Sequence, residues 1–143
     1  MSDPHPIMTD HRAKHDDQSP PAPGPGYWYL AGPYSDDPQI RYLDHMQATA
    51  SLINSGLTIF STIIHCHPMA FKYSMPTDAN FWKTYNFNMI ERSNGIILYQ
   101  LPTWKASKGV REELLFCQMK AFPVWGLQPI TEEQKTFDWT RLH

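Results

Sequence analysis

Short apolar segments with high β-propensity alternate with helix-like segments along most of this chain, and this alternation restricts the fold more than any other feature. Four segments are expected to form strands, and they are residues 27–32, 57–60, 95–99 and 123–127. The third is apolar on both faces, as a buried strand of a parallel sheet is. Strands that alternate with helices form a parallel sheet with right-handed crossovers. The pattern therefore predicts an α/β domain built on a parallel sheet of four to five strands.

The first expected helix has clear start and stop signals. Asp36 or Asp37 can cap it, Pro38 suits its first position, where a missing N–H costs nothing, and Gly56 is a natural stop. One face of this helix carries Ile40, Leu43, Gln47, Ala50 and Asn54, with Met46 and Ile53 beside it.

The other connections are expected to differ in structure. Residues 61–76 are polar and are expected to form an irregular loop. Helices are expected over about residues 80–92 and 108–121, and a short last helix is expected to begin at Thr131.

Composition limits the number of domains and the class of partner. A chain of 143 residues with 41% apolar residues is long enough for one domain with a hydrophobic core. Residues 1–26 contain six of the 13 prolines and little to bury, so we expect a disordered Pro-rich tail before a single domain over residues 27–143. The net charge of −2 gives no electrostatic reason to expect binding to a nucleic-acid polymer. A free nucleotide needs only one local anion site.

The compartment is expected to be the cytoplasm. The N-terminal segment has no apolar core like that of a signal peptide, and no apolar run approaches the roughly 20 residues that cross a bilayer. Cys66 and Cys117 form no CxxC motif and imply no disulfide framework, which fits a reducing compartment.

The topology predicts where a ligand would bind. A parallel sheet of this kind places its ligand at the carboxyl ends of the strands, near a change in strand order. That rule selects the turn Gly32-Pro33-Tyr34, the segment Ser61-Thr62 and the loop of residues 101–107. Tyr34 could stack on a base there.

The helix over residues 108–121 carries the most informative side chain. On a helical wheel, Val110, Leu114, Cys117 and Ala121 form the core stripe, and Glu113 lies about 60° to one side of it. Glu112 lies nearly opposite the stripe and is expected to be solvated. Ser107 can cap this helix, and Gly109 lets a ligand approach its free N–H groups, which attract anions. An anion site one turn from a carboxylate at the core boundary is typical of a substrate pocket.

Several short motifs resemble those of the nucleoside 2-deoxyribosyltransferase superfamily, which includes the 2′-deoxynucleoside 5′-monophosphate N-hydrolases. They are Tyr-Leu-Ala-Gly-Pro-Tyr at residues 29–34, Ser107-x-Gly109-x-x-x-Glu113, Ile-His-Cys-His-Pro at residues 64–68 and Trp-Lys-Ala-Ser-Lys-Gly-Val at residues 104–110. The likeness covers about residues 27–127 and is greatest to a bacterial and phage branch. It implies a flavodoxin-like (Rossmann-like) three-layer fold.

The resemblance also implies a covalent mechanism without a metal or redox cofactor. The glutamate matching Glu113 attacks C1′ of the deoxyribose and displaces the base, and water or a second base then resolves the glycosyl ester. The tyrosine matching Tyr29 orients that carboxylate. Where the transferases carry an aspartate near the sugar 5′ end, this chain has Ser107, which favours nucleotide substrates because an aspartate would repel a phosphate dianion.

One residue departs from the family pattern. The family usually has an aspartate that contacts or protonates the leaving base, and the matching residue here is Asn86. An amide donates and accepts hydrogen bonds but is not a general acid. A different base, substitution by another acid such as Asp78, and reduced activity all remain open.

Other residues have competing interpretations. His65, Cys66 and His67 form no zinc site alone, since zinc normally takes three or four ligands and no second cluster accompanies them. His65 is expected near the substrate, and Trp82 is expected in the core.

Two other classes of function remain beside the enzyme. The Asn86 departure suggests a non-catalytic nucleotide-binding module on the same fold, and the Pro-rich tail suggests an interaction protein. Because relatives of this size form dimers or larger assemblies in which a neighbour completes the pocket, a homo-oligomer is expected here too.

Overall fold

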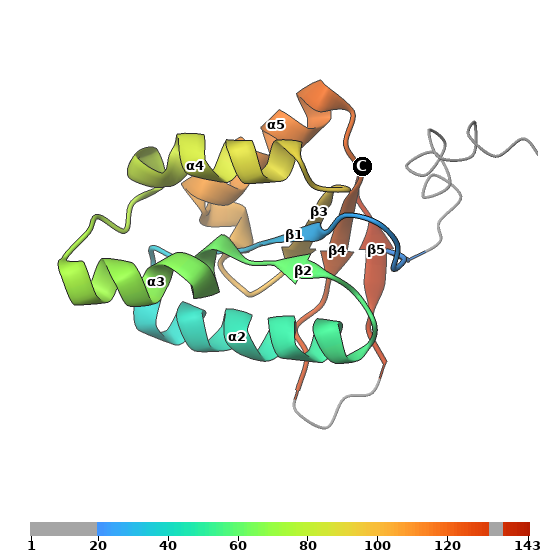
Figure 1. Ribbon diagram of the computed structural model, residues 1–143, viewed down its shortest axis with the longest axis horizontal. Coiled ribbons are helices and arrows are strands. Elements are labelled where there is room, and N and C mark those ends of the chain that lie inside the picture. Colours follow the sequence, from blue (N-terminus) through green and yellow to red (C-terminus); the bar gives the residue numbers. More distant parts are fainter. Residues whose placement is uncertain (1–19, 132–135) are drawn as a thin grey trace, which may run out of the picture.

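The structure is a computed structural model, in which residues 20–131 and 136–143 are described. Five strands form one sheet in the order β2-β1-β3-β4-β5 (Figure 1). The strands are β1 (Trp28–Ala31), β2 (Ile59–Phe60), β3 (Ile96–Tyr99), β4 (Val124–Leu127) and β5 (Trp139–Arg141). The first four run parallel, in the strand order of flavodoxin-like folds. The α/β fold expected from the sequence is therefore confirmed.

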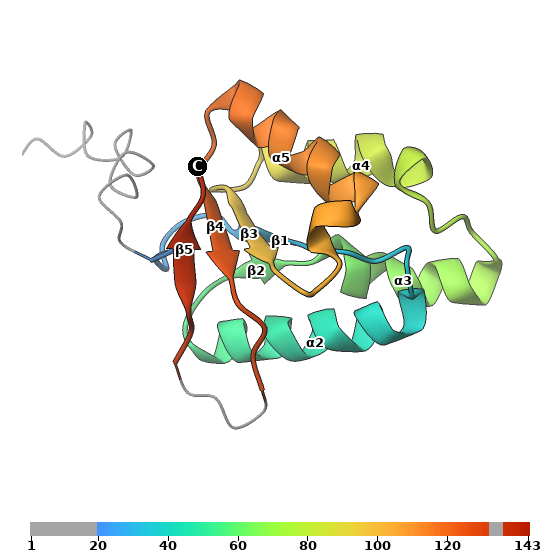
Figure 2. The ribbon, with the colours of Figure 1, turned by 180° about the vertical axis from the view of Figure 1, so that it is seen from behind.

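The sequence allows a fifth strand but gives it no position and predicts a fully parallel sheet, and strand β5 corrects that direction. It pairs with β4 in the antiparallel direction and closes one edge of the sheet (Figure 2). The short helix expected to begin at Thr131 falls mostly on residues 132–135, which lie outside the described residues.

Helices cover both faces of the sheet and make three layers (Figures 1 and 2). Helix α2 (Pro38–Asn54) lies against one face, and helices α4 (Ala79–Glu91) and α5 (Lys108–Lys120) lie against the other. Alternate residues of β1 enter the two cores: Trp28 and Leu30 pack on the α2 side, while Tyr29 and Ala31 pack on the α4–α5 side. This period of two in β1 aims the Tyr29 side chain at α5.

Helix α3 (Thr62–Tyr73) corrects the expectation of an irregular loop over residues 61–76. Ser61 caps it, since the Ser61 hydroxyl accepts a hydrogen bond from the Ile64 N–H at 3.2 Å. Pro68 lies inside the helix, where it removes one backbone hydrogen bond. The helix forms because its buried face packs against α2 and β1, and this tertiary contact outweighs the cost of the internal proline. The buried residues are Thr62, Cys66, His67 and Ala70.

For helix α2, the structure identifies the N-cap and corrects the expected apolar face. Asp37, one of the two candidate caps, is the N-cap of α2. The buried face of this helix carries His45, Ala48, Thr49 and Leu52, whereas Ile40, Leu43, Met46 and Ile53 are all at least 40% exposed. The apolar face that the sequence indicates is therefore the outer face.

Part of the predicted tail packs on the domain. Residues 1–19 lie outside the described residues. Within residues 20–26, Pro21 is buried, Ala22 accepts a hydrogen bond from the Trp28 indole at 3.2 Å, and Pro25 accepts one from the Asn94 amide at 3.1 Å. These contacts hold the chain against the sheet just before β1.

Candidate active site

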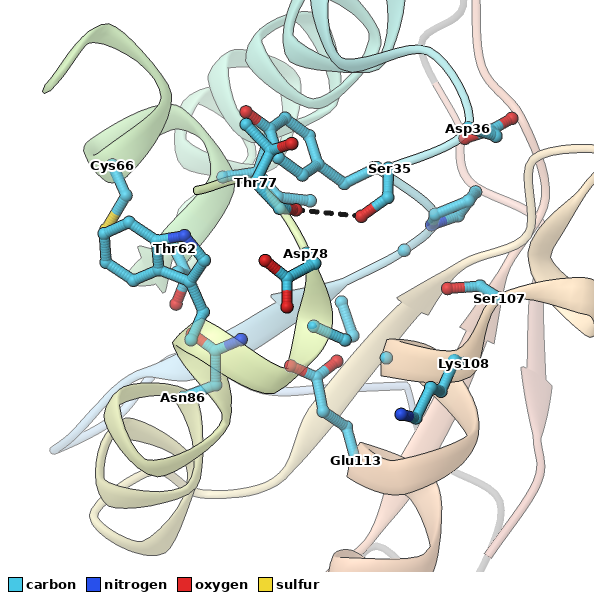
Figure 3. A pocket seen from close by; sticks show the side chains of 18 of the residues that line it. Ser35, Asp36, Thr62, Cys66, Thr77, Asp78, Asn86, Ser107, Lys108 and Glu113 are labelled. Carbon is cyan, nitrogen blue, oxygen red and sulfur yellow. Dashed lines mark hydrogen bonds between the residues drawn. The ribbon is translucent and has the colours of Figure 1, made fainter. Parts of the chain in front are cut away.

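A cavity of about 450 Å³ opens at the carboxyl end of β1 (Figure 3). Its walls come from the β1–α2 connection, α3, the first half of α4 and the start of α5, so the location is the one that the strand-order rule predicts. Nine of the ten residues expected at the site line this cavity. They are Tyr29, Gly32, Pro33, Tyr34, Asp78, Asn86, Ser107, Gly109 and Glu113.

A tyrosine of strand β1 holds the Glu113 side chain in place. Its side chain lies beside the α5 core residues Val110 and Cys117 and is only 7% exposed. The Tyr29 hydroxyl donates a hydrogen bond to Glu113 Oε2 at 2.7 Å. Tyr29 is itself 2% exposed within β1, so its ring has little freedom to move. The contact implied by the family resemblance is present, and it fixes one oxygen of the carboxylate.

Burial makes the Glu113 carboxyl a weaker acid than an exposed glutamate. Desolvation raises the pKa of Glu113 from 4.5 to about 7, because a charged carboxylate loses hydration in this environment. Hydrogen bonds from Tyr29 and Asn86 act in the opposite direction, and the nearby charge of Glu112 adds a small increase. A carboxyl group with such a pKa exchanges its proton near neutral pH, which is a property of reactive side chains.

Asn86 approaches Glu113 from helix α4 (Figure 3). Its amide lies close enough to the carboxylate to lower the Glu113 pKa. The carbonyl oxygen, Oδ1, is buried and has no hydrogen-bond partner among the described residues. The Asn86 side chain therefore stabilises the ionised form of Glu113 and keeps one acceptor unused.

One face of α4 points into the cavity. Asp78, Trp82 and Asn86 follow one another at intervals of four residues, which places them on the same side of a helix. Asp78 is the N-cap and accepts the Phe81 N–H at 3.2 Å. Trp82 is half-buried and lines the cavity, so the expectation that it belongs to the core is wrong.

The start of α5 forms the opposite part of the cavity. Ser107 caps this helix, because its hydroxyl accepts the Val110 N–H at 3.3 Å. Gly109 lines the cavity, and a Cβ added there would make only an ordinary contact, 3.5 Å from the Ala79 Cβ. Lys108 also lines the cavity, and its ammonium group donates to Asn80 Oδ1 at 3.0 Å.

The turn after β1 is shaped by a buried histidine. His45 of α2 is fully buried, and its Nε2–H donates to the Pro33 carbonyl at 3.2 Å. Burial lowers the pKa of His45 to about 4, so the ring is neutral at pH 7. A Cβ at Gly32 would lie 2.5 Å from His45 Cε1. Glycine at position 32 is therefore required by packing against His45.

A second histidine lies on the cavity wall. The Tyr34 hydroxyl donates to His67 Nδ1 at 2.6 Å, and His67 Nε2–H donates to Gln39 Oε1 at 3.2 Å. The His67 ring stacks on Tyr42 with centroids 4.4 Å apart, and burial lowers the pKa of His67. These contacts join the β1–α2 turn to α2 and α3.

His65 is not at the site. It is exposed on α3, where its ring contacts Phe60, and it does not line the cavity. Because the segment is helical, His65 and His67 are about 200° apart around the axis, and only His67 faces inward. The placement of His65 near a ligand is corrected for this reason.

The comparisons with known proteins assign the chain to a family. A family model described as "Domain of unknown function (DUF1937)" matches residues 26–128. The chain belongs to this family. No curated protein matches the chain. The matched region of the DUF1937 domain spans β1 to β4 and contains every residue that lines the cavity, whereas β5 lies outside it.

Sequence reasoning selected Thr62 but missed the rest of one wall of the DUF1937 cavity. Helix α3 contributes Thr62, Ile63, Cys66, His67 and Ala70. The spacing of residues 62, 66 and 70 is a helical signal, but the histidines and Pro68 within it hid the period. Asp36 was also missed as a lining residue. It pairs with Arg41 at 2.9 Å and accepts the Thr103 hydroxyl at 3.0 Å, and the hydrogen bond from Arg41 lowers the pKa of Asp36.

Within residues 20–131 and 136–143, no group of three or more His, Cys, Asp or Glu side chains is arranged to hold a metal ion. Within the same residues, no helix is long and apolar enough to span a bilayer.

Proposed function

We propose that this DUF1937 protein cleaves or exchanges the N-glycosidic bond of 2′-deoxynucleosides or their 5′-monophosphates, with Glu113 as the nucleophile. The proposal rests on one observation above all: a buried carboxyl group, bonded to a tyrosine hydroxyl at 2.7 Å, lines a cavity large enough for a small molecule. The resemblance of the motifs around Tyr29 and Glu113 to the deoxyribosyltransferase superfamily supports it.

In the first step, the ionised Glu113 attacks C1′ of the sugar. A carbon–oxygen bond forms as the C1′–N bond breaks, and the electron pair of that bond leaves with the base. The Tyr29 hydroxyl holds Oε2 and limits rotation of the carboxylate. Low solvent exposure favours the step, because charge interacts more strongly with the oxocarbenium-like transition state where water is excluded.

In the second step, water or another base attacks C1′ of the glycosyl ester and releases the Glu113 carboxylate. The first acceptor gives hydrolysis, and the second gives base exchange. Asp78 is the other carboxylate on the same face as Asn86, and it accepts a hydrogen bond from a backbone N–H. An acceptor of this kind suits the role of a base toward water better than the role of an acid toward the leaving group.

The residues near the α5 N-terminus bear on the presence of a 5′-phosphate. Ser107 and the Lys108 ammonium both line the cavity and favour an anion. Asp36 lies on the same side of Glu113 (Figure 3) and disfavours one, although its charge is paired with Arg41 at 2.9 Å. Both nucleosides and monophosphates therefore belong in the assay.

The test is product analysis with purified protein. Each common 2′-deoxynucleoside and its 5′-monophosphate is incubated with and without a second free base. The products are separated by chromatography and identified by mass spectrometry. Release of free base with deoxyribose 5-phosphate indicates a nucleotide hydrolase, and a newly paired nucleoside indicates a transferase. Glu113→Ala is the blank. Saturable binding with no product on long incubation would instead favour the binding module that Asn86 suggests.

A homodimer or larger homo-oligomer is part of the same proposal. The apolar side chains exposed on the outer face of α2 provide a surface that a second copy could cover. They are Ile40, Leu43, Met46 and Ile53.

A further inference from the structure

We infer that Trp82 is the platform on which the leaving base stacks, an inference that rests on the proposed function. The order of residues along α4 gives its position. Asn86 approaches Glu113 at the reacting centre and lowers its pKa, and Trp82 lies four residues closer to the start of the helix, about 6 Å along its axis. A base attached to C1′ beside Glu113 extends over that distance.

The two sides of the cavity differ in chemistry. Figure 3 shows Thr62, Cys66 and Asn86 on one side of Glu113, and Asp36, Ser107 and Lys108 on the other. The second side carries hydroxyl and charged groups that suit a sugar and its 5′ substituent. Trp82 lines the cavity from α4 between Asn86 and the N-cap Asp78, whose carboxylate is the charged group of that wall, and α3 adds the apolar side chains of Ile63 and Ala70. A planar, mainly apolar ring fits the first side.

The Trp82 ring is fixed before any ligand arrives. Its indole N–H donates to the Pro76 carbonyl at 2.8 Å. The ring makes T-shaped contacts with Phe81 and Tyr85, with centroids 5.1 and 5.7 Å away. A ring held at three points loses little conformational freedom when a base stacks on it.

Asn86 adds polar recognition next to this platform. Its Oδ1 has no hydrogen-bond partner in the part of the chain that the structure describes, and a small rotation of the amide would present it to an N–H or amino group of the stacked base. Trp82 would then hold the plane of the base, and Asn86 would read one edge. Stacking of a base on an aromatic side chain contributes about 1–3 kcal/mol, which corresponds to a change in affinity of roughly 5- to 150-fold.

Binding is measured first, without turnover. Three proteins are compared in the Glu113→Gln background: one that keeps Trp82, one with Trp82→Ala and one with Trp82→Phe. The four common 2′-deoxynucleosides and free 2-deoxyribose are titrated into each by calorimetry. Trp82→Ala should weaken nucleoside binding at least tenfold, Trp82→Phe should stay within about threefold, and deoxyribose binding should not change. Tyr73→Ala, which removes a 71% exposed aromatic ring outside the cavity, is the matched control.

Kinetics in the otherwise unchanged protein provide the second readout. Since stacking acts on substrate and transition state alike, Trp82→Ala should raise KM about tenfold or more and leave kcat within about threefold. Circular dichroism and the melting temperature establish whether each variant is folded. If Trp82→Ala does not fold, Trp82→Phe provides the comparison.

Three binding results would overturn the platform role: unchanged binding in Trp82→Ala, equal losses in the Ala and Phe variants, or an equal loss for deoxyribose. No nucleoside binding to the parent would overturn it as well. If nucleosides bind in a Trp82-dependent way but the protein never cleaves them, the proposed reaction fails and the platform stands.

Discussion

At the scale of single residues, the Glu113 carboxyl carries a conflict between stability and reactivity. Reaction at C1′ requires the ionised form, whereas burial favours the protonated form and raises the pKa to about 7. The folded protein therefore binds this proton more tightly than the unfolded chain does. The energetic penalty of ionising a buried carboxyl develops between pH 4.5 and about 7 and is complete above that range.

Glu113→Gln should remove this penalty. The variant should be more stable than the parent at pH 8, by at most about 3 kcal/mol. At pH 4 the two proteins should differ much less, because Glu113 is protonated in both the folded and unfolded parent. Urea unfolding at the two pH values measures the difference. Equal gains at pH 4 and pH 8 would mean that the carboxyl is not perturbed by burial.

Tyr29→Phe should affect both the rate and its pH dependence. The hydroxyl lowers the Glu113 pKa, so its removal should raise that pKa and move the acid limb of kcat/KM from near pH 7 to higher pH. Loss of the hydrogen bond to Oε2 should also lower kcat about tenfold or more.

Tyr99→Phe is the matched control for that variant. It removes another buried phenol hydroxyl, which bonds to the Ile130 N–H at 3.1 Å away from the cavity. Its pH profile should match that of the parent. If Tyr29→Phe also keeps the parent profile, Tyr29 has no role in setting the ionisation of Glu113.

At the scale of secondary-structure elements, the sequence predicted most of the frame and part of the site. The strand-forming segments and helices α2, α4 and α5 have local signals: caps at Asp37 and Ser107, and an apolar period that places Glu113 at the core boundary. The structure adds the geometry of the contact between Tyr29 and Glu113, which are 84 positions apart in the chain.

The elements that sequence reasoning missed depend on contacts distant in the chain. Helix α3 tolerates Pro68 because its face packs on α2 and β1, and β5 forms because β4 offers an edge. Neither contact can be recognised from a short stretch of the sequence. The outward apolar face of α2 has the same origin, since the inner face is set by His45 packing under Gly32.

Gly32→Ala should disturb the β1–α2 connection. The added methyl group would meet His45, which is fully buried and hydrogen-bonded to Pro33, so the turn must move. We expect a loss of about 1–3 kcal/mol in stability, together with a fall in activity because Pro33 and Tyr34 line the cavity.

Gly109→Ala is the comparison for that variant. Its added methyl group would make an ordinary contact in a helix, and stability should rise by up to about 1 kcal/mol. Thermal melts of the two variants distinguish the cases. A Gly32→Ala protein as stable as the parent would show that the His45 contact does not constrain the turn.

At the scale of the whole molecule, we expect the outer face of α2 to form an interface with a second copy of the chain. Sedimentation should give a homodimer or larger assembly at micromolar concentration, and Leu43→Glu, at the centre of that face, should shift it toward the monomer. Leu115→Glu places the same charge at a 56% exposed site on α5 and should leave the assembly intact. A parent protein that stays monomeric at all concentrations would contradict the expectation.

The central claim is that Glu113 bonds covalently to the sugar. Acid quenching during turnover of a deoxynucleoside or its 5′-monophosphate, followed by digestion and mass spectrometry, tests it directly. We predict that the peptide containing Glu113 gains the mass of one deoxyribosyl group, or of its 5-phosphate, and that Glu113→Gln shows neither this adduct nor turnover. Full turnover by Glu113→Gln, or an adduct on another peptide, would contradict the claim.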